Sequence, residues 1–348
     1  MLDQGPEPTA DQPPGVLDDH DLVLFMAADA GERVGPRALP GPAPAAEIGV
    51  HDPLTGATRW AYLIRFAHSA PRSTVEYVDY DPAHDRVRSR RVGLGFSHGI
   101  PDYLAVADDT GELGANLLDR LKVRAQASFL WGLIRISRSE EDLTTQFVGW
   151  KRGPIRVIRR QRQRVRIGWG IRSPTFGSST YFYRDYAELP VSLTLNVPPR
   201  YFFGDIDVRA ILDFRDLRGW SLLTANLTEP LPLDGRMTAQ KEALNKLPAP
   251  WFALLSPKVV LVQTMEVSPS LSSLRQRLIY HEAGKPHPPE SVPGEEPGVG
   301  FELDRWDAVA AGTHQLASTS YALPPALPVR AFMQARSVPL QIRVGQIP

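Results

Sequence analysis

Apolar and polar residues alternate along many short segments of this chain, and this alternation limits its fold more than any other feature. In residues 120–129, every odd position is apolar and every even position is polar or basic. A period of two is the period of a β-strand, whose successive side chains point to opposite faces. Similar segments occur at 58–66, 74–80, 191–197, 206–214, 259–267 and 340–344. The pattern predicts about 18–20 strands, a number typical of a β-sandwich or barrel.

Helices are expected to be few and short, because the chain contains 33 prolines and 27 glycines, which both disfavour helix interiors. The best helix candidate is 238–246, where Thr238 could cap the first turn, and a shorter one is expected at 139–144. The sequence therefore predicts an all-β fold. We expect one large antiparallel β-sandwich, supersandwich-like, with one or two short helices. Two smaller β-sandwich domains, divided near residue 175, are the alternative.

The composition excludes several kinds of chemistry. The chain has 348 residues and no cysteine, so it has no disulfide, no thiolate nucleophile and no zinc or iron–sulfur site held by cysteines. None of its eight histidines forms an H-x-x-x-H or H-E-x-x-H motif, and no phosphate-binding loop motif is present. Aspartates at 205–216 are interleaved with arginines, which indicates ion pairing instead of a calcium site. We therefore predict no cofactor and no metal.

The first twenty residues are acidic and proline-rich and contain little to bury, so residues 1–20 are predicted to be a disordered arm before a single large β domain at 21–348. The start of the chain lacks the basic and apolar regions of a signal peptide, and no apolar run reaches the roughly 18 residues of a membrane span. The leader suits the flexible start of a mature exported protein, which favours a periplasmic or extracellular location. A cytoplasmic location is the alternative.

The most distinctive segment is 151–166, KRGPIRVIRRQRQRVR, which is strongly basic and contains no acid. At the period of a strand, one face of this segment carries a row of four arginines: Arg160, Arg162, Arg164 and Arg166. Their spacing would be roughly 6.6 Å, and a guanidinium group binds an oxyanion with two parallel hydrogen bonds. The row could therefore meet phosphates, sulfates or uronate carboxylates that repeat along a polymer. The competing interpretation is a solvated strand that is protected from aggregation by its charge.

Further residues could extend this basic surface. The polar face of 120–129 carries Arg120, Lys122 and Arg124, and it would join the row if the two strands share a sheet. Trp169 lies three residues after Arg166, and aromatic side chains between basic ones suit polysaccharides and single-stranded nucleic acid. The net charge is zero, with 39 basic and 39 acidic residues, which argues against a general nucleic-acid binder. The predicted partner is an anionic polysaccharide, an envelope component or another protein.

Two short motifs could indicate catalysis. Residues 95–99, GFSHG, match the G-x-S-x-G motif of serine hydrolases, but the flanking residues favour a glycine-rich turn that contains His98. Residues 181–186, YFYRDY, bring together phenols, an arginine and a carboxylate. A polysaccharide lyase could use Tyr183 to move a proton and Arg184 to neutralise a uronate. A strand with an Arg184–Asp185 surface pair is the simpler interpretation.

Two hypotheses follow. The first is a non-enzymatic, exported β-sandwich protein that binds an anionic glycan, an envelope surface or a protein partner through the arginine row. The second is a carbohydrate-active enzyme, lyase-like or hydrolase-like, on the same fold, with Tyr183, Arg184 and His98 as candidate catalytic residues. The sequence does not decide whether the protein is an enzyme.

Overall fold

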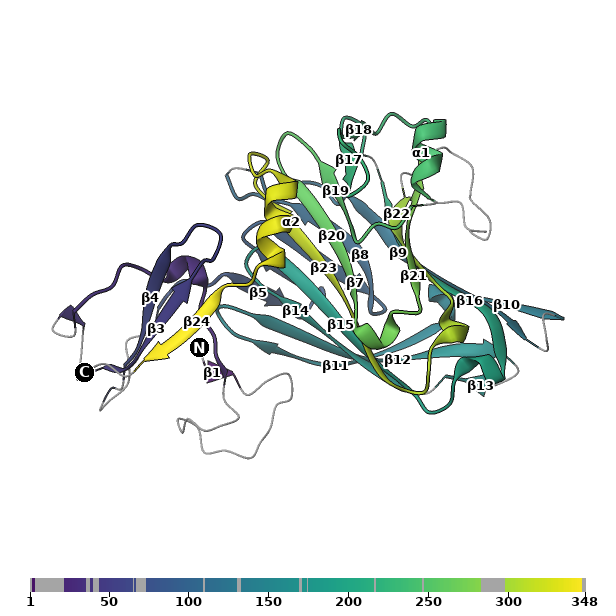
Figure 1. The fold of residues 1–348 in the computed structure, drawn as a ribbon, viewed down its shortest axis with the longest axis horizontal. Helices are drawn as coiled ribbons and strands as arrows, with labels where there is room; N and C mark the ends of the chain where they lie inside the picture. Colours follow the sequence, from purple (N-terminus) through teal and green to yellow (C-terminus); the bar gives the residue numbers. More distant parts are fainter. Residues whose placement is uncertain are drawn as a thin grey trace. The chain divides into compact units, whose positions relative to one another are not determined.

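The computed structural model describes residues 2–3, 22–35, 38–39, 44–64, 66, 73–108, 110–129, 133–168, 171–173, 175–215, 217–245, 247–282 and 298–345. The chain forms two compact units, one made of Met1–Glu76 with Ala326–Pro348 and the other of Tyr77–Pro325 (Figure 1). Residue 175 lies inside the second unit, between two strands of one sheet. Most of the predicted disordered arm at 1–20 lies outside the described residues.

The first unit is built around a three-stranded antiparallel sheet. Its order is β24 (Gln341–Gly345), β3 (Pro44–His51) and β4 (Thr58–Ile64). The unit also contains two helical segments, α2 (Val329–Ser337) and the single turn η1 (Ala27–Asp29). It further contains a short antiparallel pair of strands, β1 (Leu2–Asp3) and β2 (Leu22–Val23). The strand predicted at 340–344 therefore pairs with residues near the start of the chain, so this unit needs both ends of the sequence.

The second unit has a ten-stranded antiparallel sheet, called here the large sheet, as its first layer. In spatial order its strands are β11 (Leu143–Arg152), β12 (Val157–Gly168), β14 (Phe176–Phe182), β15 (Tyr186–Leu195), β23 (Gly312–Leu323), β20 (Val260–Val267), β19 (Trp251–Leu255), β17 (Ser221–Thr224) and β18 (Leu231–Pro232), with β13 (Ile171–Arg172) paired to β12.

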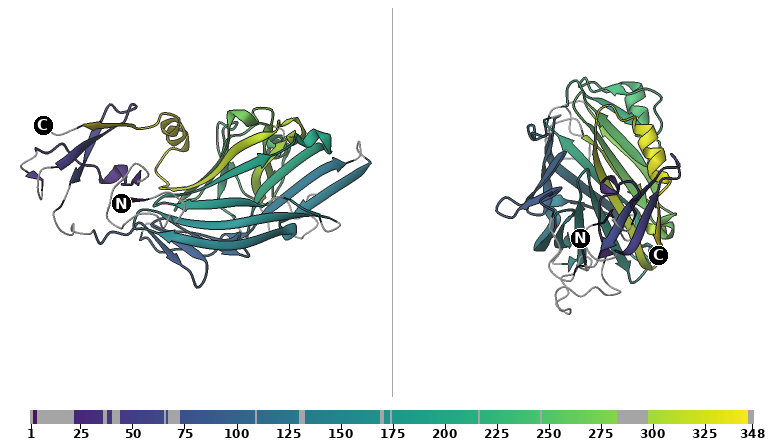
Figure 2. Two further views of the ribbon diagram at one scale, coloured as in Figure 1. Left: turned by 90° about the horizontal axis from the view of Figure 1, so that it is seen from below. Right: turned by 90° about the vertical axis from the view of Figure 1, so that its left-hand side faces the viewer.

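The opposite layer consists of two smaller sheets. A five-stranded sheet has the order β10 (Ile134–Ser139), β9 (Leu118–Phe129), β16 (Phe203–Phe214), β22 (Gly298–Asp304) and β21 (Arg275–His281). A four-stranded meander contains β5 (Val78–Asp81), β6 (Arg86–Ser89), β7 (Val92–Ser97) and β8 (Ile100–Val106). Figure 2 shows the two layers edge-on.

Apolar side chains between the layers form the core. One cluster joins Leu303 of the five-stranded sheet to Leu193 and Leu316 of the large sheet, around the fully buried Leu271. A second joins the four-stranded sheet to β12, β14 and β15, with Val78, Tyr80, Val87, Val157, Phe182 and Ala187 as its buried members. Burial of such side chains from both layers is the main stabilising term of a sandwich. The all-β prediction and its sandwich architecture are therefore confirmed.

The predicted short helices are also present. The segment expected at 238–246 forms α1 (Ala239–Leu244), and the Thr238 hydroxyl accepts a hydrogen bond from the Lys241 backbone N–H. The segment expected at 139–144 forms a single 3₁₀ turn, η3 (Glu140–Asp142), which Ser139 caps. Helix α2 was not predicted, because no serine, threonine, aspartate or asparagine precedes it to mark its start.

Candidate functional site

The four predicted arginines lie in a row along one face of β12. The pairing of β12 with β14 is regular from Val157 to Gln163, so alternate residues keep to one face. Arg162, Arg164 and Arg166 are exposed and Arg160 is half-buried. We call Arg160, Arg162, Arg164 and Arg166 the arginine row. The other face of β12 carries Val157 and Arg159, which are buried between the layers.

The neighbours of the arginine row are small or uncharged. On β11, the residues opposite Arg160, Arg162 and Arg164 are Gly149, Gln146 and Thr144. On β14, the residues opposite Arg160 and Arg162 are Ser179 and Gly177. No carboxylate lies at any of these paired positions, so no acidic side chain is directly opposite Arg162 or Arg164 on the neighbouring strands.

Two members of the row have contacts of their own. Arg166 Nη2 lies 3.0 Å from Asp142 Oδ1, and Arg164 Nε donates a hydrogen bond to the Thr175 hydroxyl. Arg162 has no ion pair within the described residues. The row therefore keeps at least one exposed guanidinium that is available to a ligand. An exposed pair such as Arg166–Asp142 contributes little to stability and can exchange its partner readily.

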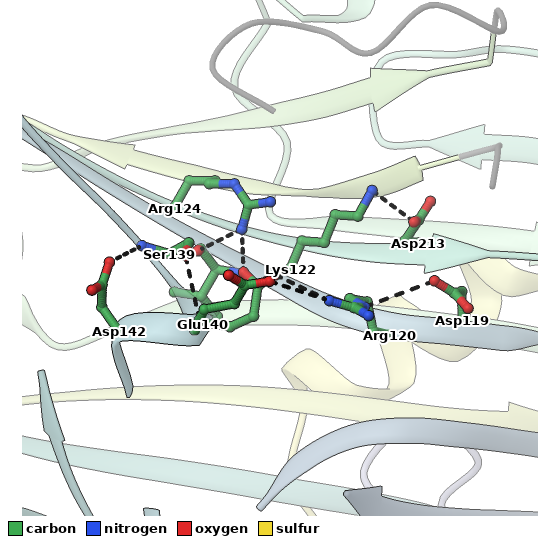
Figure 3. A network of polar contacts seen from close by, with 10 residues as sticks. Asp119, Arg120, Lys122, Arg124, Ser139, Glu140, Asp142 and Asp213 are labelled. Atoms are coloured by element: carbon green, nitrogen blue, oxygen red, sulfur yellow. Dashed lines mark hydrogen bonds and ion pairs between the residues drawn. The ribbon is translucent and has the colours of Figure 1, made fainter. Parts of the chain in front are cut away.

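The second predicted basic face is arranged differently. Lys122 and Arg124 lie on the polar face of β9, but they are only 2% and 3% exposed. Lys122 Nζ is 2.7 Å from Asp213 Oδ2, and Arg124 forms an ion pair with Glu140 (Figure 3). Only Arg120 is partly exposed, and carboxylates surround it at 3.8–4.0 Å. The expectation that this face joins an exposed basic surface is therefore wrong for Lys122 and Arg124.

The position of Glu140 explains part of this arrangement. Strand β10 pairs with β9 only as far as Arg124, so the next backbone N–H of β9, that of Val123, has no strand partner on this side. Glu140 follows the end of β10, and its Oε2 accepts a hydrogen bond from that N–H at 3.0 Å and also pairs with Arg124. A buried carboxylate requires such partners, because an unpaired one would be very costly. The Glu140 carboxylate and the Arg124 guanidinium therefore stabilise the point at which the pairing of β10 with β9 ends.

A cluster of tyrosines adjoins the arginine row. The Tyr183 and Tyr186 rings stack with centroids 4.5 Å apart, and the Tyr321 ring follows at 5.4 Å from Tyr186. Buried Arg156 donates a hydrogen bond of 3.2 Å to the Tyr183 hydroxyl and also lies over the Tyr181 ring. Burial, together with the nearby Tyr183, raises the pKa of Tyr186 well above its usual value. Tyr186 is therefore a neutral phenol at physiological pH.

The three catalytic candidates do not form one site. Ser97 and Ile100 pair across a two-residue turn whose residues, His98 and Gly99, have φ values of +49° and +78°. GFSHG therefore connects two strands of a hairpin, whereas a nucleophile elbow needs a strand followed by a helix. The turn of His98 approaches Thr145 of β11.

Tyr183 and Arg184 lie in the turn between β14 and β15. Tyr183 follows β14 and contacts Arg156 and Tyr186, whereas Arg184 pairs with Asp185 at 3.1 Å. The Arg184–Asp185 pair is the one that the simpler interpretation of this segment predicted. Trp169 lies outside the described residues.

The structure also contains a charged pair that the sequence did not indicate. Arg159, from the buried face of β12, contacts Asp85 of the four-stranded sheet through Nε–Oδ1 at 2.8 Å and Nη2–Oδ2 at 2.5 Å. The Tyr80 hydroxyl donates to the same carboxylate at 2.7 Å. The period of the strand assigns Arg159 to the inward face, but only the tertiary structure identifies its partner, 74 residues away.

The fold is that of a large, two-layer antiparallel β-sandwich. The sequence matches no protein-family model, and a search of curated proteins finds no match. Within the described residues, no helix is long and apolar enough to cross a membrane, and no group of three acidic or histidine side chains is placed to hold a metal ion.

Several solved structures resemble the chain. An alpha-mannosidase from Enterococcus faecalis V583 is similar over 88% of this chain and 40% of its own, with 11% sequence identity and a TM-score of 0.50. A protein of glycosyl hydrolase family 38 from Enterococcus faecalis is similar over 88% and 41%, with 11% identity and a TM-score of 0.48. The chain thus spans about two fifths of the length of these proteins. At this level of identity, the likeness to the mannosidase shows the fold alone.

Proposed function

We propose that this protein is a non-catalytic glycan-binding protein, whose arginine row on β12 binds an anionic polysaccharide. The observation that carries the proposal is a regular row of guanidinium groups on one strand face, in which Arg162 and Arg164 are exposed and have no carboxylate directly opposite them. A row fixed on a sheet keeps a constant spacing of roughly 6.6 Å, which suits charges that repeat along an extended polymer.

Three considerations favour a glycan over other polyanions. The net charge of the chain is zero, so the protein lacks the overall positive charge of a general nucleic-acid binder. The row is flanked by hydroxyl and amide side chains, including Gln146 and Ser179, which can bond to sugar hydroxyls. The likeness to part of a protein named as an alpha-mannosidase makes carbohydrates the first ligands to test. A periplasmic or extracellular location would give such a surface access to extracellular glycans.

The alternative, a carbohydrate-active enzyme, has weaker support, because Tyr183 and His98 contact different neighbours and do not converge. The stacked tyrosines and the Arg156–Tyr183 hydrogen bond are its remaining basis.

The test is binding to alginate, heparin, lipopolysaccharide and single-stranded DNA at low and high salt, with the purified protein. A variant with Arg160, Arg162 and Arg164 replaced by Ser should lose binding to the anionic glycan. The control variant replaces three other exposed arginines, Arg88, Arg90 and Arg275, by Ser, and so removes the same charge elsewhere. We expect salt-sensitive binding that the control retains. Equal loss in both variants, or no glycan binding by the native protein, would refute the proposal. A shortened polymer would support the enzyme.

A further inference from the structure

Two large aromatic side chains are exposed on β11, the edge strand of the large sheet. The side chains of Phe147 and Trp150 are 47% and 41% exposed. They are three residues apart, which in a regular strand would put them on opposite faces. The structure places both on the same face, and the reason is an irregularity in the strand.

That irregularity is a β-bulge. Phe147 is opposite Gln161, Gly149 opposite Arg160, and Trp150 opposite Arg159, so Val148 is an extra residue in β11. The extra residue shifts the alternation by one position, and both aromatic side chains then share the face of Arg159 and Gln161. Because their partners are two residues apart on β12, the rings are spaced by roughly 6–7 Å along the strand.

Both rings are held in place by groups that are themselves fixed. The Trp150 ring packs on Tyr80 with centroids 5.1 Å apart. The Arg159 guanidinium lies 5.3 Å from the centre of the Phe147 ring, and its two bonds to Asp85 prevent it from moving. An aromatic ring that is fixed from behind and exposed in front loses little conformational entropy when a ligand stacks on it.

We propose that Phe147 and Trp150, here called the aromatic edge, stack on pyranose rings of a glycan. This inference rests on the proposed function and names a second subsite for the same class of ligand. The apolar face of a pyranose ring matches an aromatic ring in size, and polar groups lie at both ends of the aromatic edge. The exposed His98 lies at the turn beside Thr145, and the exposed Arg152–Asp79 pair, 2.9 Å apart, lies at the other end.

The neighbouring structure favours a glycan over a protein strand. A bulge interrupts the regular row of backbone groups that a partner strand would need for pairing along this edge. The arginine row occupies the opposite face of the same pair of strands, β11 and β12, so the two surfaces meet at the free edge of the sheet. A polysaccharide long enough to pass around this edge would contact both.

The test compares Phe147→Ala and Trp150→Ala with a matched control, in which two other exposed aromatic residues, Tyr201 and Phe202, are replaced by Ala. The probes are alginate and a neutral mannan oligosaccharide, measured by calorimetry and by tryptophan fluorescence. We expect each single variant to bind both probes roughly tenfold more weakly, and the control to bind normally. Binding of the neutral probe should not depend on salt. Trp150→Phe, which keeps a ring, should retain most of the affinity.

The outcomes separate this inference from the proposed function. If the arginine variant loses alginate and the aromatic variants do not, the aromatic edge is refuted and the arginine row stands. If alginate does not bind but mannan binding depends on Trp150, the aromatic edge stands and the proposed function is refuted. If Trp150→Ala changes only the molecular mass in solution, or only binding to single-stranded DNA, the aromatic edge is not a glycan site and the inference is overturned.

Discussion

Replacing Asp85 by Asn should destabilise the second unit strongly, although it changes only one atom of the side chain. Arg159 is 1% exposed, and the Asp85 carboxylate supplies its only negative partner within the described residues. Loss of that carboxylate leaves a buried guanidinium without its counter-charge. Asn is also a suitable probe because Asp85 has a φ of +47°, a left-handed conformation that Asn adopts as readily as Asp. The substitution therefore tests the charge without straining the backbone.

The size of the expected loss of stability follows from how deeply Arg159 and Asp85 are buried. Breaking a fully buried pair costs about 3–5 kcal/mol. The Asp85 side chain is 27% exposed, so water screens part of the interaction and a loss of about 2–3 kcal/mol is expected. For a unit of this size, 1 kcal/mol corresponds to a change of roughly 2–4 °C in Tm, so Tm should fall by roughly 4–12 °C.

The assay is urea and thermal unfolding followed by circular dichroism. Asp79→Asn is the matched control, because Asp79 pairs with Arg152 at a similar distance but at the surface, and its loss should cost less than about 1 kcal/mol. Adding Arg159→Met to Asp85→Asn should recover part of the stability, since it removes the unpaired buried charge. If Asp85→Asn is no more destabilising than Asp79→Asn, this pair does not join the two layers as we argue.

Three further predictions use the same assay. Lys241→Met should cost about 3 kcal/mol, because Lys241 is the buried counter-charge of Glu282 at 2.5 Å, and urea unfolding will measure the loss. Gly99→Ala should lower the urea midpoint much more than Gly111→Ala. Both glycines have positive φ, but only at Gly99 would the new Cβ meet another side chain, at 2.2 Å. Asp207→Asn should stabilise the protein at pH 7, since burial raises the pKa of Asp207 and its ionised form therefore opposes folding there. That gain should shrink as the pH falls through the raised pKa of the folded state, and it should vanish below the unfolded pKa of about 3.9, where Asp207 is neutral in both states; a constant gain would contradict the argument.

The strands and helix α1 could be predicted because their signals are local. Alternation in 120–129 predicted β9, and Thr238 predicted the start of α1. The order of the strands was not predictable in this way. The neighbours of β9 in the sheet are β10, which is adjacent in sequence, and β16, which begins 74 residues after β9 ends. No local pattern specifies such a pairing, because it depends on which edges remain free after the nearer strands have paired.

The polar face of β9 shows a second limit of prediction from the sequence. A polar residue on a strand is expected to face water, and the sequence around Lys122 and Arg124 does not show that acidic side chains will neutralise them. Their partners, Asp213 and Glu140, come from a neighbouring strand and from a turn after the next strand. A covered polar face and an exposed one have the same period, so they can be distinguished only when the partners are known.

The arginine row and the aromatic edge also differ in whether the sequence alone can predict them. The arginine row follows from alternation alone, because β12 is regular over the residues concerned. The aromatic edge does not, because the period of two assigns Phe147 and Trp150 to opposite faces, and the extra residue Val148 reverses that assignment. A bulge costs ladder hydrogen bonds, and it is tolerated where it directs a side chain to a useful position. Deleting Val148 should restore regular pairing and keep both rings on the face of Arg159 and Gln161, because Phe147 and Trp150 would then be two residues apart. That variant should therefore bind mannan and alginate as the native protein does, and a loss of mannan binding would show that a shared face alone does not make the aromatic edge.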